Sequence, residues 1–438
     1  MMITNWGKYP SVPGPEVSDI RPESLNESSS WIPRGMGRCY GDSSLGEKMI
    51  SSRRYTRMLD FDPQTGRLTC ESGVTYEDLL HTFVPRGWFP PVTPGTKFVS
   101  LGGALASDVH GKNHHSEGGI SDHVESFELL LPSGEQKHCS RSTEPELFRA
   151  TVGGMGLTGF ISSLTLRMKK IETSAIRYEY IKAGNLQKIL PLFEEFSAAT
   201  YSMAWIDTIS GGKNLGRSIL MKGEHATLEE VKASKWAGDP LQFPKKLPLV
   251  VPFNFPSFVL NPLTMKAFNL FYYGKQLQPR KTGLTDYDSF FYPLDSIHHW
   301  NRIYGKRGFT QYQFVVPATA GQEAISTVLR HMHRHRLGSF LSVLKLLGPS
   351  DGYLSFPMEG FTLTLDFPIS DRLFPFLDQL DEMVKGWGGR VYLSKDVRMN
   401  ADMMKATYPA LGQFLEIKRS IDPSGNIRSL QAERLGLV

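Results

Sequence analysis

Residues 94–124, PGTKFVSLGGALASDVHGKNHHSEGGISDHV, constrain the fold more strongly than any other part of this chain. They carry the glycine pairs Gly102-Gly103 and Gly118-Gly119 among small and polar residues rather than bulky apolar ones. Glycine allows the backbone to approach a ligand closely, and exposed backbone amides form cradles for anions. The segment therefore predicts a loop that holds a flat ligand bearing phosphate. A glycine-rich surface turn with incidental histidines is the alternative interpretation.

A second glycine-rich segment, residues 33–42, has the sequence PRGMGRCYGD, with three glycines and two arginines. Backbone N–H groups and guanidinium groups are favoured partners of phosphate oxygens. The segment predicts another phosphate contact, and a solvated basic turn is the alternative.

The third glycine-rich segment, residues 154–159, matches the G-x-G-x-x-G pattern of nicotinamide-dinucleotide folds. In those folds the pattern follows a strand and opens a helix. Here it follows the helix-like run PELFRATVG and precedes residues 160–168, which alternate as a strand does. We therefore expect a turn that faces a cofactor within a different fold.

Length and composition set the broad class of the protein. At 438 residues the chain exceeds the size at which one core stops growing, so about two or three domains are expected. The 49 basic and 44 acidic residues are interspersed, which argues against nucleic-acid binding. Three cysteines without a C-x-x-C pair predict neither a disulfide framework nor a zinc site, and a reducing cytoplasm suits them best. His114 and His115 are adjacent and point apart, so no metal site is expected.

Hydrophobic periodicity predicts helices and strands on both sides of a domain boundary, which we place near Ile171 because clustered glycines give way there to longer mixed segments. Before the boundary it predicts a hairpin over 55–61 and 68–72, helices over 76–84 and 144–150, and strands over 124–131 and 160–168. Beyond the boundary it predicts strands over 308–316, 339–347 and 361–367, and helices over 186–199, 226–236, 321–335 and 374–387. This alternation suggests one sheet covered by helices.

Residues 243–273, FPKKLPLVVPFNFPSFVLNPLTMKAFNLFYY, are rich in aromatic and aliphatic residues and in prolines. The prolines argue against a membrane-spanning helix, and no run approaches the ~20 apolar residues that a span requires. Two interpretations stay open for this segment, a buried irregular connection and a patch that faces lipid. Any membrane contact is expected to be peripheral, at the inner face of a membrane, on an otherwise cytoplasmic protein.

Six motifs taken in order resemble one known family: PRGMGRCYGD, PGTKFVSLGGALASDVHGKNHH, GGMGLTGFI, TQYQFVVP, LSKDVRM and DPSGN. They are similar to the decaprenylphosphoryl-β-D-ribose 2'-oxidase family, within the vanillyl-alcohol-oxidase/PCMH superfamily of flavoproteins. The resemblance spans nearly the whole chain. It implies a PCMH-type FAD-binding domain over residues 1–170 and an α+β substrate (cap) domain, an antiparallel sheet covered by helices, over 171–390. Residues 391–438 would then return to the FAD domain.

The resemblance also implies which residues bind FAD. Residues 34–42 would line the pyrophosphate, 95–112 would hold diphosphate and isoalloxazine, and 153–159 would follow the adenosine. The positions carried over are Arg34, Gly35, Gly37, Arg38, Cys39, Tyr40, Gly41, Pro94, Gly95, Thr96, Gly102, Gly103, Ser107, Asp108, His110, Gly111, Lys112, Asn113, Gly153, Gly154, Gly156, Gly159, Ile161 and Lys395. Many relatives link FAD to a histidine in a G-x-G-H-S turn, where this chain has Arg38. Non-covalent FAD is therefore implied, and Cys39 is expected to be a small buried thiol.

Oxidation of a secondary alcohol needs a hydride acceptor, a base for the hydroxyl proton and positive charge near the reduced flavin. The resemblance implies that Lys395 and Lys112 supply the charge, facing flavin and substrate, and that Tyr40 lies near the flavin. As the base we put His110 first, because imidazole titrates near neutrality, and Lys395 second.

Three further residues are expected to bind the substrate. Gln311 and Gln313 lie on one face of an alternating strand, where both amides can reach sugar hydroxyls. Lys345 matches a pocket position of the family and is expected to meet the substrate phosphate. Where the family has a cysteine before V-D-F-P, this chain has Thr364 before L-D-F-P. That departure affects covalent-inhibitor chemistry and leaves the oxidation intact.

The resemblance implies an FAD-dependent oxidoreductase that oxidises the 2'-hydroxyl of a polyprenylphosphoryl-β-D-ribose to the ketone, in cell-envelope glycan synthesis. An NAD(P)H-dependent short-chain reductase would act next and complete epimerisation to arabinose. One alternative is an aldonolactone or alditol oxidase that uses a free sugar. Another is a non-catalytic flavin-binding subunit of a glycan-synthesis complex, which the presence of Lys395 and His110 disfavours. The electron acceptor, O2 or a quinone, stays open.

Overall fold

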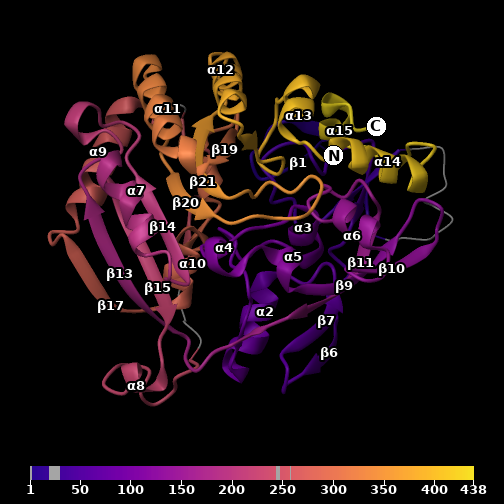
Figure 1. Ribbon diagram of the computed structural model, residues 1–438, viewed down its shortest axis with the longest axis horizontal. Coiled ribbons are helices and arrows are strands. Elements are labelled where there is room, and N and C mark those ends of the chain that lie inside the picture. Colours follow the sequence, from indigo (N-terminus) through magenta and orange to yellow (C-terminus); the bar gives the residue numbers. More distant parts are fainter. Residues whose placement is uncertain (1, 19–29, 243–246, 257) are drawn as a thin grey trace.

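The computed structural model describes residues 2–18, 30–242, 247–256 and 258–438. Its first part contains two small sheets (Figure 1). One is parallel, in the order β3-β5-β4, from Glu16–Val17, Lys48–Ser51 and Trp31–Arg34. The other is antiparallel, in the order β10-β9-β11-β7-β6, from Gln136–Ser140, Val124–Leu130, Phe160–Arg167, Arg67–Glu71 and Met58–Asp62. The predicted hairpin and both predicted strands of this part are confirmed.

Helix α2 (Tyr76–Phe83) shows how the sequence fixes a local element. Thr75 accepts a hydrogen bond from the backbone N–H of Asp78, whose side chain accepts one from the N–H of Thr75. This capping box satisfies two amides that the first turn would leave unpaired. Tyr76, Leu79, Leu80 and Phe83 form the buried face. The helix predicted over 144–150 is also present, as α6 (Pro145–Thr151).

The central glycine-rich segment is more helical than predicted. It contains α3 (Leu101–Ala106), α4 (His114–Glu117) and α5 (Ile120–His123), so the prediction of one continuous loop was wrong. Leu101, Ala104 and Leu105 explain the difference, because they pack into the core against the five-stranded sheet. Burial of these side chains outweighs the weak helix propensity of the intervening glycine pair.

The second part of the chain centres on an eight-stranded sheet, in the order β17-β13-β15-β14-β20-β21-β19-β22. Its strands, in that order, are Arg280–Asp286, Ala175–Ala183, Ser218–His225, Tyr201–Ile206, Ser342–Leu347, Gly360–Pro368, Phe309–Pro317 and Arg390–Val391. Helices α7 (Leu186–Glu195), α11 (Gly321–His335) and α12 (Leu373–Gly386) lie along this sheet (Figure 1). The predicted sheet covered by helices is therefore present.

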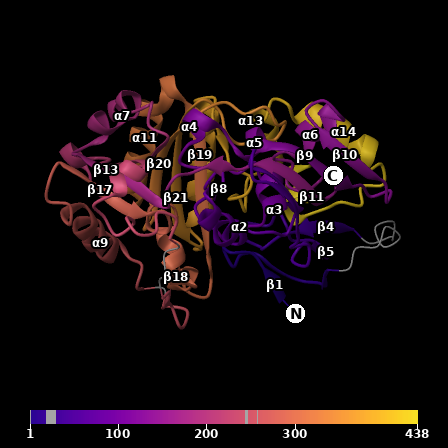
Figure 2. The same ribbon diagram turned by 90° about the horizontal axis from the view of Figure 1, so that it is seen from below.

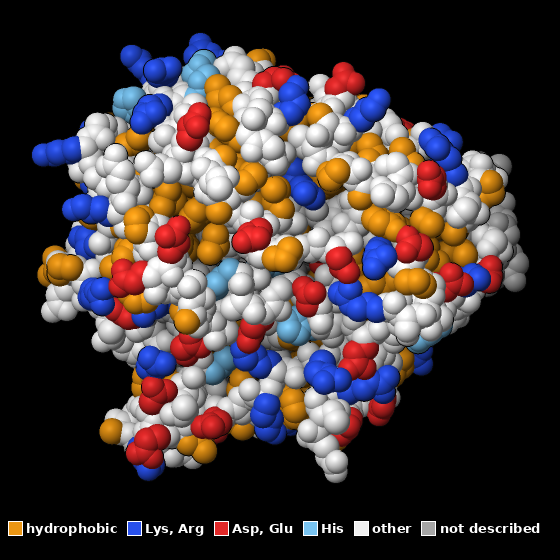
Figure 3. Space-filling model, in the orientation of Figure 1, with side chains coloured by type: hydrophobic (Ala, Val, Ile, Leu, Met, Phe, Trp, Pro, Cys, Tyr) orange, Lys and Arg blue, Asp and Glu red, His pale blue; other side chains and the backbone are white. Residues whose placement is uncertain are grey.

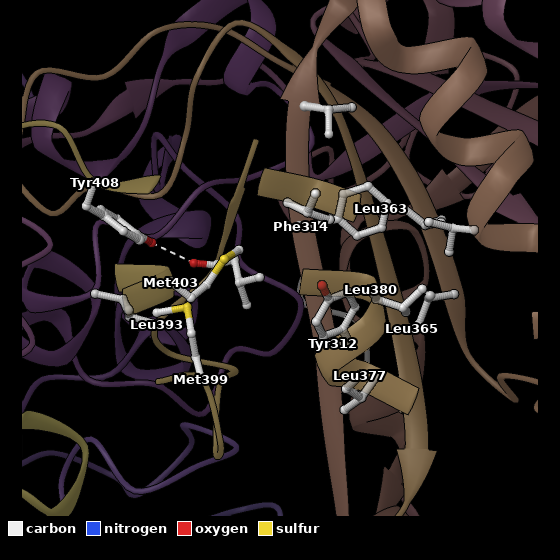
Figure 4. Packing of buried hydrophobic residues seen from close by; sticks show 14 of the residues in the cluster. Tyr312, Phe314, Leu363, Leu365, Leu377, Leu380, Leu393, Met399, Met403 and Tyr408 are labelled. Atoms are coloured by element: carbon white, nitrogen blue, oxygen red, sulfur yellow. Dashed lines mark hydrogen bonds between the residues drawn. The ribbon is translucent and has the colours of Figure 1, made fainter. Parts of the chain in front are cut away.

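Strand alternation divides β19 and β21 between two environments. Tyr312 and Phe314 point into the core with Leu363 and Leu365, beside Leu377 of α12 (Figure 4). The intervening residues of both strands point to the opposite face. That second face of the sheet turns toward the first part of the chain, and it carries the polar side chains of the candidate site.

Two segments of the second part differ from prediction. The helix predicted over 226–236 is only α8 (Leu228–Val231), and just beyond it the Ser234 hydroxyl donates to the carbonyl of Val231 at 2.7 Å. A serine that hydrogen-bonds nearby backbone in this way competes with helix continuation. Within 243–273, residues 262–273 belong to α9 (Pro262–Gly274), which was not predicted and which Asn261 caps.

Of the two interpretations of residues 243–273, the buried connection does not fit most of the described apolar side chains, and the patch that faces lipid stays a prediction. Residues 243–246 and 257 lie outside the described part. The following apolar side chains of this segment are exposed: Leu247, Leu249, Val250, Phe253, Phe258, Leu263, Leu270 and Phe271. These residues form a run of exposed apolar side chains. On the face of the protein drawn in Figure 3, by contrast, apolar side chains are interspersed with positive and negative ones.

The last part of the chain returns to the first. Helices α13 (Ala401–Thr407), α14 (Leu411–Ile421) and α15 (Leu430–Leu435) follow the eight-stranded sheet, and α14 lies against α6 (Figure 2). Ile427 forms a β-bridge with Trp31, and Arg434 forms ion pairs with Asp42 and Asp396, both at 2.8 Å. These contacts support the prediction that residues 391–438 return to the FAD-binding part of the chain. The division into residues 1–170, 171–390 and 391–438 remains our proposal.

The remaining elements are short connections. Three pairs of strands are β1 with β2 (Met2–Thr4, Ser11–Pro13), β8 with β12 (Trp88–Phe89, Lys169–Lys170) and β16 with β18 (Leu249–Val250, Ile297–His298). Helix α10 (Tyr287–Phe291) follows β17 directly. Across the described ranges, no helix combines the length and apolar character needed to cross a membrane.

Candidate active site

The three glycine-rich segments predicted from the sequence meet in space. The backbone N–H of Met155 donates to the carbonyl of Ala106 at 2.8 Å, which joins the third segment to the central one. A Cβ at Gly35 would lie 2.4 Å from Ser100 Oγ, and one at Gly41 would lie 1.7 Å from the Asp396 carbonyl oxygen. Only glycine permits these approaches. The three segments therefore form one cradle, which the loop after β22 closes.

Buried polar atoms on this cradle have no hydrogen-bond partner among the residues that the structure describes. They include Ser100 Oγ, Asp108 Oδ1 and Asn113 Oδ1. Ser100 Oγ lies between Gly35 and Gly103, at 2.4 and 3.0 Å from the Cβ that each would carry. Unpaired buried polar groups are rare in native proteins, so a cluster of them indicates a polar ligand. A diphosphate and a ribityl chain supply the acceptors and hydroxyls that such groups need, and the residues present fit FAD.

The side chains of the two arginines predicted at the pyrophosphate, Arg34 and Arg38, both contact other protein side chains. The buried guanidinium of Arg34 binds Asn5, the carbonyl of Thr4 at 3.0 Å and Glu16 at 3.3 Å. Its side chain is therefore used inside the protein, and its carbonyl accepts a hydrogen bond from the backbone N–H of Ser52 at 2.9 Å. The guanidinium of Arg38 lies over the rings of Trp6 and Phe98, at 4.3 and 5.0 Å from their centroids.

Most other predicted cofactor residues lie on the cradle itself. Within the first segment these are Gly37, Cys39 and Tyr40; within the second Pro94, Gly95, Thr96, Gly102, Ser107, His110, Gly111 and Lys112; within the third Gly153, Gly154, Gly156 and Gly159. Ile161 differs, because it begins β11 and packs in the core of the five-stranded sheet.

Three lysines predicted at the site come together from three elements. Lys112 lies in the central segment, Lys345 on β20 and Lys395 on the loop after β22. Burial, together with nearby positive charge, lowers the pKa of Lys112 and of Lys345 to about 7. Burial also lowers the pKa of Lys395 to about 8, against the opposing effect of Asp366. Burial is the main cause for all three lysines, and an anionic ligand beside them would favour their charged forms.

Contacts of these lysines differ. Lys112 Nζ donates to the carbonyl of Phe291 at 2.9 Å. Lys395 Nζ lies 4.0 Å from the ring centroid of Tyr40. Neither Lys345 Nζ nor Lys395 Nζ forms a hydrogen bond or ion pair with the residues that the structure describes. Both amines thus have donors free for a ligand, and Lys345 lacks even the ring contact of Lys395.

His110 lies beside the lysines and packs against the stacked rings of Phe356 and Tyr392, at centroid distances of 5.5 and 5.2 Å. Burial, followed by the charge of Lys345, lowers its pKa well below 6.5, so the imidazole is neutral. Gln313 Nε2 lies 2.9 Å from His110 Nε2. Because an amide nitrogen only donates, His110 Nε2 is the acceptor, and a substrate hydroxyl must displace Gln313 to reach it.

The structure adds two residues to the predicted site, Asp366 and Tyr304. Asp366 is fully buried on β21, directly opposite Gln311 in the register of β19 and β21. Its carboxylate accepts hydrogen bonds from Gln311 Nε2 and, at 3.3 Å, from Tyr304 Oη. The same Gln311 nitrogen lies 3.4 Å from Tyr40 Oη. The single ionisable residue in the strand of residues 361–367 is a sequence signal that could have identified Asp366.

Comparisons with known proteins can be set against this geometry. Residues 16–140 match the model of the FAD binding domain family. The chain is 38% identical over 413 residues to decaprenylphosphoryl-β-D-ribose oxidase of Mycolicibacterium smegmatis, which covers 93% of this chain and 89% of the relative. The chain belongs to the decaprenylphosphoryl-β-D-ribose oxidase family. An uncharacterised protein of Streptomyces coelicolor is 33% identical over 381 residues, 83% of this chain and 100% of the relative.

More distant relatives match less of the chain. L-gulonolactone oxidase 3 of Arabidopsis thaliana is 24% identical over 178 residues, 39% of this chain and 30% of the relative. Membership in the decaprenylphosphoryl-β-D-ribose oxidase family, together with the FAD binding domain, makes this chain an FAD-dependent oxidoreductase with the predicted PCMH-type fold. The roles of individual site residues remain predictions.

Acid precipitation is expected to release FAD from the purified protein. The turn that carries the linking histidine in covalent relatives has Arg38 here, and Arg38 is packed against Trp6 and Phe98. Cys39 Sγ contacts Ser44 Oγ at 3.4 Å. Flavin absorbance should therefore appear in the supernatant after trichloroacetic acid treatment. Flavin that remains with the pelleted polypeptide would show a covalent bond and contradict this expectation.

Proposed function

We propose that this protein oxidises the 2'-hydroxyl of a polyprenylphosphoryl-β-D-ribose to the 2'-ketone with FAD as its cofactor. The observation that carries the proposal is the convergence of Lys112, Lys345 and Lys395 with a neutral His110 beside the glycine-rich cradle. A sugar attached to phosphate needs cationic donors for the phosphate and a proton acceptor beside the reacting hydroxyl. The relative that covers 93% of the chain carries this activity in its name.

The site residues take distinct parts in this reaction. Lys345, whose donors are free, binds the phosphodiester. Gln313 and Gln311 orient the ribose hydroxyls, and His110 Nε2 takes the proton of the 2'-hydroxyl once that hydroxyl replaces Gln313. Lys395 is the alternative base, since a pKa of about 8 leaves part of it neutral near pH 7.5. Bound FAD would accept the hydride from the 2'-carbon.

The product of this reaction has a ketone where the substrate had a hydroxyl. Reduction of that ketone from the opposite face would give the arabinose configuration. We therefore place an NAD(P)H-dependent short-chain reductase next in the sequence. Both enzymes would then act on sugars whose prenyl chain keeps them at a membrane surface. We propose that this protein works peripherally at the inner face of that membrane.

The exposed apolar side chains near α9 are the part of the protein best suited to that surface. Phe253 is 62% exposed, Phe258 is 74% exposed and Phe271 is 71% exposed. Lys266 lies on α9 among them and Lys275 follows it. Each buried CH2 contributes about 0.8 kcal/mol and each lysine near an anionic surface about 1 kcal/mol. Reversible peripheral binding follows from a few such groups.

Changing Phe253, Phe255 and Phe258 together to Ser tests this lipid-facing part. The variant should lose sedimentation with anionic liposomes, and its kcat/KM for a long-chain prenylphosphoryl ribose should fall by tenfold or more, about the effect of losing one buried aromatic side chain. Its kcat/KM for a water-soluble short-chain analogue should stay unchanged. Leu59→Ser with Leu228→Ser, at leucines that are 49% and 50% exposed elsewhere, is the control. Unchanged efficiency of the triple variant on the long-chain substrate would remove this segment from lipid recognition.

A further inference from the structure

Two buried carboxylates lie beside the lysines of the site. Asp366 accepts hydrogen bonds from Gln311 and Tyr304 on the sheet side. Asp295 accepts one from the backbone N–H of Lys97 at 2.7 Å and borders a small pocket with Arg38 and Trp300. The charge of Asp366 acts on Lys395, whereas that of Asp295 acts on Lys112. Each acid is therefore matched to a different lysine.

Asp366 also controls the position of Tyr40 through a chain of contacts. Gln311 Nε2 bridges the Asp366 carboxylate and Tyr40 Oη, and Lys395 lies over the same tyrosine ring at 4.0 Å. Phe309 also contacts Tyr40 in a T-shaped arrangement, with ring centroids 5.2 Å apart, and it stacks on Tyr304 at 4.2 Å. Asp366 thus holds both partners, Gln311 and Tyr304, that shape the surroundings of Tyr40.

We propose that Asp366 is a positioning residue, which fixes the Tyr40 hydroxyl through Gln311 and whose negative charge keeps Lys395 in its ammonium form above the Tyr40 ring. This inference deepens the proposed function, on which it rests only for the part that Lys395 takes in the oxidation. The geometry is specific, because Asp366 is the residue of β21 that lies opposite Gln311 in the strand register. A Glu or Asn at this place would keep or remove the charge with little change in volume.

The groups around Asp366 and Lys395 determine how the protonation of Lys395 should depend on pH. Those that face Asp366, Tyr40 or Lys395 are Arg38, Cys39, His110, Asp295, Tyr304 and Lys345. Burial raises the pKa of Asp366 to about 7. Above that pH the carboxylate is ionised and favours protonated Lys395, and below it the counter-charge is lost. Removing the charge of Asp366 should therefore let Lys395 lose its proton at lower pH.

A direct test uses the full-length, FAD-loaded protein with 13C-labelled lysine side chains, titrated by NMR from pH 5 to 10. Lys395→Met assigns the Lys395 signal and Lys112→Met the Lys112 signal. Asp366→Asn should move the titration midpoint of Lys395 to lower pH by about one pH unit, the scale for losing a nearby opposite charge. Asp366→Glu should restore the midpoint. An unchanged Lys395 midpoint in folded Asp366→Asn would overturn the proposal.

Asp295→Asn is the matched control, because it removes another buried carboxylate at the same site. It should lower the midpoint of Lys112 and leave that of Lys395 in place. If Asp295→Asn and Asp366→Asn shift the titration midpoint of Lys395 equally, any buried carboxylate at the site acts on Lys395. That result would also overturn the proposal. These readouts need no substrate, so failure of the protein to oxidise a prenylphosphoryl ribose would refute the proposed function separately.

Tyr304→Phe gives a second test should Asp366→Asn fail to fold. It removes a donor to the carboxylate while leaving the charge in place, so Asp366 should bind its proton more tightly. The inflection that Asp366 imposes on the Lys395 signal should then move to higher pH. No movement of that inflection would contradict the assigned link between Tyr304, Asp366 and Lys395.

Discussion

Lys395→Met is expected to slow flavin reduction by about 10²-fold or more while FAD stays bound, the usual scale for losing a positioned electrostatic or acid–base group. Lys395 Nζ lies over Tyr40 at the junction of the cradle and the sheet, with its pKa lowered to about 8 by burial. Methionine keeps the aliphatic stem against the ring and removes only the charge. Anaerobic stopped-flow absorbance measures the rate of reduction directly.

Lys395→Arg is the matched control for that experiment. A guanidinium keeps the positive charge but cannot give up its proton near neutral pH. If Lys395→Arg recovers most of the rate of flavin reduction, Lys395 acts through its positive charge. If Lys395→Arg is as slow as Lys395→Met, Lys395 acts as the base. Reduction at the wild-type rate in Lys395→Met would remove Lys395 from the mechanism.

Lys345→Met is expected to raise KM for a phosphorylated ribose by about 10- to 100-fold, as expected for a charge-assisted hydrogen bond, with a smaller change in kcat. In the free protein, burial lowers the pKa of Lys345 to about 7, so the amine loses its proton as pH rises above that value. An anionic phosphodiester binds the protonated form. Affinity should therefore fall as pH increases through 7 to 8, with proton uptake on binding.

Calorimetry in buffers with different ionisation enthalpies measures that uptake. Lys345→Met should reduce it, leaving the part that Lys112 contributes, because the pKa of Lys112 is also lowered to about 7. Affinity that is constant between pH 6 and pH 9 would show that neither lysine binds the phosphate. A free sugar should show little effect of the substitution at any pH.

Local patterns in the sequence predicted much of this site. The alternation of residues 308–316 placed Gln311 and Gln313 on one face, and the structure places both there, opposite Asp366 and Thr364 of β21. The reversed order of helix, glycine turn and strand around residues 154–159 excluded a nicotinamide-type fold, and the turn joins the cradle through Met155 and Ala106. Both features depend on neighbours along the chain, which periodicity and turn residues report directly.

Features that depend on distant partners escaped the sequence. The importance of Asp366 arises from its register against Gln311 and from Tyr304, which no local pattern specifies. The inward-turned side chain of Arg34 depends on Asn5 and Glu16, so residue type alone suggested a phosphate contact. Helix α9 was hidden by prolines that suggested irregular backbone, although Pro262 occupies the first turn of that helix, where proline is tolerated.

Mixing the purified protein anaerobically with a polyprenylphosphoryl-β-D-ribose tests the central claim most directly. The flavin absorbance near its long-wavelength maximum should disappear, and one equivalent of the 2'-keto sugar should form for each flavin reduced. Free ribose at the same concentration should bleach the flavin at least about 10²-fold more slowly, because it lacks the phosphate that we propose the lysines bind. Equal bleaching by free ribose, or none by the prenylphosphoryl substrate, would contradict the account and favour a soluble-sugar oxidase.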